Sequence, residues 1–160
     1  MRLKHIPLIV LSGLLWFGIG IFLMTLGLNF IVEAAANKET PSFLIRTFTK
    51  LAGNQEQSAL FLIVIGLALG FIKGRVVLAK SAARVVKRIL SLPNPVPLSQ
   101  AYGKGYLMLI AGMVMLGMSL KWLQLPLDFR GLIDVAIGSA LMNGAIAYIR
   151  HADAIRKQRS

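Results

Sequence analysis

The sequence predicts an all-α polytopic membrane protein, with four transmembrane helices arranged as two hairpins in a single membrane domain over residues 1–160. Hydrophobic residues make up 56% of the chain and charged residues only 15%, which is far from the composition of a soluble domain. Four windows are long and apolar enough to cross a hydrocarbon core of about 30 Å. They cover residues 8–32, 58–75, 105–123 and 131–149.

The net charge of +12 is concentrated on one side of this predicted topology. The amino terminus, the loop at 73–104 and the tail at 150–160 hold thirteen basic residues and one acid, whereas the other side holds five of each. This is the bias of the positive-inside rule, so we expect both termini to be cytoplasmic. Short loops with this bias are typical of a bacterial inner membrane. Because topology accounts for the charge excess, we do not expect nucleic-acid binding.

The first span, residues 8–32, follows a short basic leader. Its apolar run is longer than the roughly 7 to 15 residues of a signal peptide, so we expect it to be retained as a membrane helix. The small residues at 34–36 leave cleavage as the alternative. Gly13, Gly20 and Gly27 recur every seven residues, which keeps them on one face of the helix. A face of small residues lets a neighbouring helix approach closely.

Residues 33–57 form the predicted outer loop, which has Pro41 near its middle. Within it, residues 42–52 place apolar side chains at helical spacing, which favours a short helix lying on the outer surface. The side chains at this spacing are Phe43, Leu44, Thr47, Phe48 and Leu51. A solvated loop with a few buried aromatic side chains is the alternative.

The chain is organised around residues 58–92, which contain neither proline nor an acidic residue. As one helix this segment would extend about 52 Å, well beyond the hydrocarbon core. Its second half is therefore predicted to continue past the membrane as a basic cytoplasmic helix. Gly66, Gly70 and Gly74 form a doubled small-xxx-small pattern in the apolar half, which indicates helix packing.

An ideal helix places five basic side chains of this segment within an arc of about 100°. They are Lys73, Lys80, Arg84, Lys87 and Arg88, while Leu78, Ala79, Ala82, Val85, Val86, Ile89 and Leu90 lie opposite and Arg75 breaks the partition. A basic amphipathic helix at the cytoplasmic face attracts anionic lipid headgroups, at about 1 kcal/mol per basic residue. Two alternatives remain: the charges only fix topology and solubility, or a protein partner docks on this face.

The second predicted hairpin begins after the proline-rich part of the loop at 73–104. The methionines of its first span indicate flexible packing rather than a copper site, because no cysteine or intramembrane histidine accompanies them. Ala136, Ala140 and Gly144 form a further line of small residues for packing. Aligning Gly20 with Gly112, and residue 65 with residue 137, indicates a weak parallel repeat of the two hairpins.

Five polar residues collect toward the outer side of the predicted spans: Asn29, Glu33, Lys121, Arg130 and Asp134. Arg130 and Asp134 are four residues apart at the start of the fourth helix. The helix dipole stabilises the carboxylate there, and the two side chains can form an ion pair. This outer polar cluster either holds the helix ends together or forms a vestibule for a solute or an ion.

The sequence contains no HExxH, GxSxG, P-loop or glycine-rich dinucleotide turn, and no cysteine, so we expect no enzyme activity, cofactor or metal. It favours a non-catalytic membrane protein that packs with itself or a partner and binds anionic lipid through the basic helix. The first alternative is a small oligomeric channel or transporter that uses the outer vestibule. The second is a lipid-modifying membrane enzyme.

Overall fold

The computed structural model is mostly helical in its described part, with short connecting segments and one pair of two-residue strands. It describes residues 2–37, 39, 42–93, 96–97, 111–112, 115, 118–119 and 122–157. In chain order the elements are β1 (Arg2–Leu3), α1 (His5–Ala36), α2 (Phe43–Ala52), α3 (Gln55–Lys73), the π-helix η1 (Gly74–Leu78), α4 (Ala79–Ser91), β2 (Val96–Pro97) and α7 (Leu127–Lys157).

Within the described ranges, three helical segments are long and apolar enough to cross a membrane, as expected of an integral membrane protein. They are His5–Ala36, Gln55–Ser91 and Leu127–Lys157. Each is longer than its predicted span, because the helix continues through the polar residues at its ends. The predicted span at 105–123 lies for most of its length outside the described residues. The four-helix count and the internal repeat therefore stay predictions.

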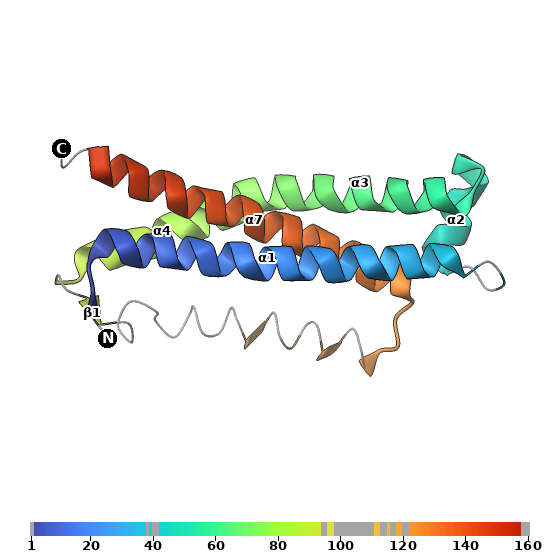
Figure 1. Cartoon of the computed structure of the whole chain (residues 1–160), viewed down its shortest axis with the longest axis horizontal. Coiled ribbons are helices and arrows are strands. Elements are labelled where there is room, and N and C mark those ends of the chain that lie inside the picture. Colours follow the sequence, from blue (N-terminus) through green and yellow to red (C-terminus); the bar gives the residue numbers. More distant parts are fainter. Residues whose placement is uncertain are drawn as a thin grey trace.

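The helices α1 and α7 run antiparallel and pack together along their length (Figure 1). The three glycines of the seven-residue repeat are buried against α7, Gly13 at Ala145 and Tyr148, Gly20 at Gly138, and Gly27 at Gly131. The facing residues of α7, at positions 131, 138 and 145, are themselves spaced by seven. Matching seven-residue periods keep the two faces in register, as in left-handed helix pairs.

The helices α3 and α7 lie side by side and run in the same direction. Gly66 faces Leu132 and Val135, and Gly70 faces Ala136 and Ser139 further along α7. Further along both helices, Gly74 faces Ala140 and Asn143, and Leu78 faces Gly144. One hydrogen bond crosses this interface, from the Ser139 hydroxyl to the Leu67 carbonyl oxygen at 3.2 Å. The small line 136, 140, 144 therefore packs against α3 and η1.

The predicted continuity of residues 58–92 is present, since α3, η1 and α4 form one helical segment, Gln55–Ser91. The π-helix between them was not predicted. The residues that face α7 and the core, namely 66, 70, 74, 78, 82 and 86, recur every four positions. Residues spaced by four do not stay on one face of an ordinary α-helix, because that helix has about 3.6 residues per turn and the line of residues rotates gradually around it. A π turn has more residues per turn and therefore reduces this rotation.

The short helix α2 covers the end of the bundle where α1 finishes and α3 begins (Figure 1). Its buried side chain is Ile45, which packs with Ile31, Leu62 and Val135. The predicted face is only partly correct, because Phe43 and Leu51 are 60% and 82% exposed. Leu44 and Phe48 do pack against the core. The periodicity of so short a helix did not distinguish the two faces.

The opposite end of the bundle holds the start of α1 and the ends of α4 and α7 (Figure 1). There β1 and β2 pair antiparallel, with Arg2 opposite Pro97 and Leu3 opposite Val96. The His5 Nε2–H donates to the Leu92 carbonyl oxygen at 2.9 Å, which ties the first residue of α1 to the residue that ends α4. Both ends of the α1–α7 pair are therefore anchored, one by α2 and the other by α4.

Candidate functional site

The five basic side chains predicted to share one arc are all exposed on the segment from α3 to α4. We call Lys73, Lys80, Arg84, Lys87 and Arg88 the basic surface. Most of the apolar side chains opposite them are buried or half-buried, with Ala82, Val86 and Ile89 fully inside the protein. The segregation of charge and apolar surface therefore holds in three dimensions.

The apolar side of α4 is covered by protein rather than left open for insertion into lipid. Val86 and Ile89 belong to a core cluster that also contains Leu8 of α1 and Leu141 and Tyr148 of α7. A helix lying in the membrane interface instead buries its apolar face among the acyl chains. Because α4 has no such free face, attraction of this end to lipid would come mainly from its charges.

Arg75, which broke the partition on an ideal helical wheel, is also exposed. It lies in η1, where Val76 and Val77 are exposed as well, so this part of the segment is accessible over more of its circumference than α4 is. Its guanidinium stands over the Phe71 ring, 5.9 Å from the ring centroid. Such stacking favours the cation and holds it at the surface of the helix.

The last turns of α7 bring further basic side chains to the same end of the bundle (Figure 1). Arg150, Arg156 and Lys157 are exposed there, and Asp153 is an exposed acid among them. The sequence assigned these residues to a basic tail, and the structure continues α7 through them to Lys157. This end therefore carries a strong excess of positive charge.

The outer polar cluster is distributed between α1 and α7, and its member Lys121 lies outside the described residues. Asn29 and Glu33 are exposed, whereas Asp134 is buried where α7 meets Gly27. Arg130 acts electrostatically on Asp134, and its guanidinium lies 4.6 Å from the centroid of the Phe30 ring. Arg130 thus contacts both helices of the α1–α7 pair.

Two features of this architecture were missed by sequence reasoning. The first is the seven-residue line of Gly131, Gly138 and Ala145, which the matching spacing in α1 could have revealed. The second is Asp128, which is fully buried and accepts hydrogen bonds from the Leu44 and Ile45 amides at 2.6 and 3.2 Å. These residues are more than 80 positions apart in sequence, so no local pattern links them.

Comparison of the chain with protein-family models, with curated proteins and with solved structures gives no match. Function is therefore inferred from the surfaces of the molecule.

Proposed function

We propose that this chain is a non-catalytic integral membrane protein whose basic surface binds anionic lipid headgroups on the cytoplasmic side. The observation that carries the proposal is the exposure of all five cations of the basic surface on a helix whose opposite side is buried. At about 1 kcal/mol per basic residue near an anionic surface, five cations provide a substantial attraction. The exposed cations at the end of α7 add to it.

The proposed topology places both termini in the cytoplasm and four helices across the membrane, in a bacterial inner membrane. Its first support is charge, because α4, which carries four of the five cations of the basic surface, and the basic end of α7 extend to the same end of the bundle (Figure 1). Its second support is the direction in which the helices run. Since α3 and α7 run the same way, the chain between them must return along the bundle, which favours a further span at 105–123.

Self-association or a partner protein completes the proposal. Several large apolar side chains of α1 and α3 are exposed, among them Leu14, Phe22 and Phe61. In a membrane these side chains contact acyl chains or other helices. Four members of the basic surface, Lys80, Arg84, Lys87 and Arg88, would remain accessible in either arrangement, because they lie on α4, which reaches the end of the bundle (Figure 1). Lys73 lies midway along the bundle, next to Gly74, which faces Ala140.

The test is retention of anionic lipid after charge reversal. In nanodiscs containing equal amounts of phosphatidylglycerol and phosphatidylcholine, we expect K80E/R84E to lower retention of phosphatidylglycerol by at least about thirtyfold. The loss of two attractions of about 1 kcal/mol each gives this factor, and the repulsion by the new carboxylates adds to it. The matched control is R46E/K50E, which reverses two exposed cations four residues apart at the other end. This control should leave retention unchanged.

Salt provides an independent readout of the same proposal. Because the apolar side of α4 is buried in the protein, retention should weaken steeply as ionic strength rises and the screening length falls below about 8 Å. Equal effects of the two double variants, or retention that does not respond to salt, would contradict headgroup binding at the basic surface. Loss of a co-purifying protein in K80E/R84E, with lipid retention intact, would assign the surface to a protein partner.

A further inference from the structure

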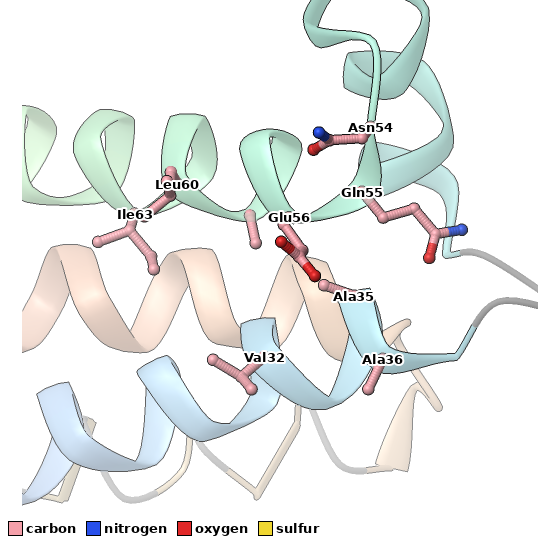
Figure 2. Close-up of a pocket in the computed structure, with 9 residues that line it drawn as sticks. Val32, Ala35, Ala36, Asn54, Gln55, Glu56, Leu60 and Ile63 are labelled. Carbon is pink, nitrogen blue, oxygen red and sulfur yellow. The ribbon is translucent and has the colours of Figure 1, made fainter.

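The apolar part of α3 is shorter than the hydrocarbon core of a membrane. It covers residues 59–72 and ends at Lys73. At roughly 1.5 Å per residue it extends about 21 Å, against a core of about 30 Å. Its outer limit is set at a groove between α1 and α3, where Glu56 lies beside Ala35 near the end of α1 (Figure 2). The missing length therefore falls on the basic side, beyond Lys73.

Contacts with α7 place Lys73 level with the middle of α1. Gly20, which is close to the midpoint of α1, faces Gly138 of α7. Gly74 faces Ala140, which is two positions further along α7. Lys73 precedes Gly74 and is exposed. Its charge therefore lies midway along the helix that carries the longest apolar run of the chain.

The helix α4 packs beside the first half of α1, within the predicted span at 8–32. Leu8 and Trp16 share one core cluster with Ala82 and Val86 of α4. At this level α1 shows apolar side chains to its surroundings, namely Leu11, Leu14 and Leu15. The segment from α3 to α4 shows cations instead. We call this exposed set the cationic flank: Lys73, Arg75, Lys80, Arg84, Lys87 and Arg88.

Part of the cationic flank lies at the depth of the hydrocarbon core. The apolar run of α1 ends at Val32, before the charge of Glu33, and about 20 residues of helix cover the core. A core that reaches outward to Val32 begins near Gly13, which leaves the level of Gly20 and Lys73 about 10 Å inside it. A core placed nearer the start of α1 contains more of the flank.

Cations at this depth require water and anions beside them, because a charge that faces acyl chains is costly. The protein supplies little compensation. The chain has no acidic residue between Glu56 and Asp128, and α1 has none before Glu33. Asp153 of α7 lies further out, in the last turns of that helix. Lipid phosphates are the anions that a membrane offers, and a short apolar segment thins the bilayer around it.

We propose that the cationic flank is a path along which phospholipid headgroups reach the middle of the membrane, so that the chain speeds exchange of phospholipids between the two leaflets. This inference rests on the proposed headgroup binding and adds an activity to it. Lys80 and Arg84 collect phosphates from the cytoplasmic leaflet, and Lys73 and Arg75 hold them deeper. The apolar barrier that remains is the stretch 59–72, about 21 Å instead of about 30 Å.

The first test measures exchange in liposomes of phosphatidylglycerol and phosphatidylcholine that contain the full chain and a trace of tail-labelled fluorescent phosphatidylglycerol. Dithionite bleaches only the outer leaflet, so exchange appears as bleaching beyond half of the signal. We expect exchange with the wild-type chain, slowed about thirtyfold in K73L/R75L, since two attractions to phosphate are lost. The matched control R46L/K50L, which removes two exposed cations from α2, should exchange like the wild type.

The conservative variant K73R/R75K keeps both charges and should exchange at close to the wild-type rate. The leucines of K73L/R75L lengthen the apolar stretch of α3, so this variant should still insert. Bleaching that stops at half with the wild-type chain would overturn the proposal, as would equal exchange by K73L/R75L. Retention of phosphatidylglycerol without exchange would overturn this inference alone, whereas loss of retention would count against the proposed function.

A second test compares the two flanks at one level. Leu78 and Trp16 line the same small cavity, so Val77 and Leu15 beside them lie at similar depth, and they are 56% and 49% exposed. The natural chain has no cysteine. In liposomes with a water-soluble maleimide on both sides, V77C should react and L15C should be protected. Equal labelling of the two would overturn the proposal, because this half of the bundle would then lie wholly in water or wholly in lipid.

Discussion

At the scale of single residues, Gly20 and Gly27 of α1 meet Gly138 and Gly131 of α7 backbone to backbone. A Cβ atom at Gly27 would lie 2.7 Å from the Gly131 carbonyl oxygen, and one at Gly131 would lie 2.7 Å from the Gly27 carbonyl oxygen. Backbone atoms in two packed helices cannot move aside as a flexible side chain can. Close approach of this kind replaces the hydrophobic driving force that membrane helices lack.

Gly27→Ala should therefore destabilise the fold by about 1 to 3 kcal/mol, the usual cost of overpacking a well-packed interior. Gly18→Ala is the matched control in the same helix, because nothing lies within 4 Å of a Cβ at Gly18. We expect it to leave stability unchanged or to raise it by up to about 1 kcal/mol, because alanine is the better helix former. Unfolding midpoints in one detergent give the comparison. Similar midpoints for the two variants would show that α1 and α7 do not pack through Gly27.

At the scale of elements, α2 begins without a cap of its own. Ser42 makes no capping hydrogen bond at its start, and the carboxylate of Asp128 in α7 takes that role by accepting from Leu44 and Ile45. The negative charge of this carboxylate is also attracted to the positive, N-terminal end of the α2 dipole. A second contact joins α2 to α3, where the Thr49 and Ser58 hydroxyl oxygens lie 3.0 Å apart. The position of α2 thus depends on polar contacts from two helices.

Asp128→Ala should loosen α2, since two amides lose their acceptor and an N-cap contributes about 0.5 to 2 kcal/mol. Faster hydrogen exchange at Leu44 and Ile45 is the expected signature. Asp153→Ala is the control, because it removes an exposed acid from the same helix α7. The cap assignment fails if Asp128→Ala leaves exchange in α2 as slow as in the wild-type chain.

The same elements show which parts of the fold could be predicted from sequence patterns. The continuous segment Gln55–Ser91 was predictable because residues 58–92 lack proline and acids, so both helix propensity and topology agree there. The faces of α7 were predictable only in part. This helix carries two small-residue lines, spaced four toward α3 and seven toward α1, and the shorter spacing alone was recognised.

The π turn at Gly74–Leu78 and the cap by Asp128 could not be predicted by the same means. The π turn keeps contact residues spaced by four facing the neighbouring helices, by reducing their rotation around the helix axis. Its position therefore depends on tertiary packing, which the local sequence does not specify. The groove at Glu56 likewise exists only because the ends of α1 and α3 lie together. Charge segregation on α4 was predictable, since it needs only helical periodicity.

At the scale of the whole molecule, the directions of α3 and α7 constrain the rest of the chain. The segment that begins with α3 ends with α4 at the basic end, and α7 begins at the other end beside α2 (Figure 1). The connection from Leu92 to Leu127 must therefore cover the length of the bundle. Within a membrane, backbone exposed to lipid must satisfy its hydrogen bonds internally, which a helix does. A helix over 105–123 would reach about 28 Å, close to the core thickness.

Single cysteines can test this crossing directly, because the natural chain has none. Ser91→Cys lies at the end of α4, and Gln124→Cys lies just before α7, with both native side chains exposed. With a membrane-impermeant maleimide on intact cells, we expect labelling at 124 and protection at 91 until the membrane is permeabilised. Lys50→Cys, on α2, should label like 124. Labelling of 91 and 124 from the same side would mean that the connection does not cross. The reverse pattern, with 91 labelled and 124 protected, would instead invert the proposed orientation and place the basic surface outside.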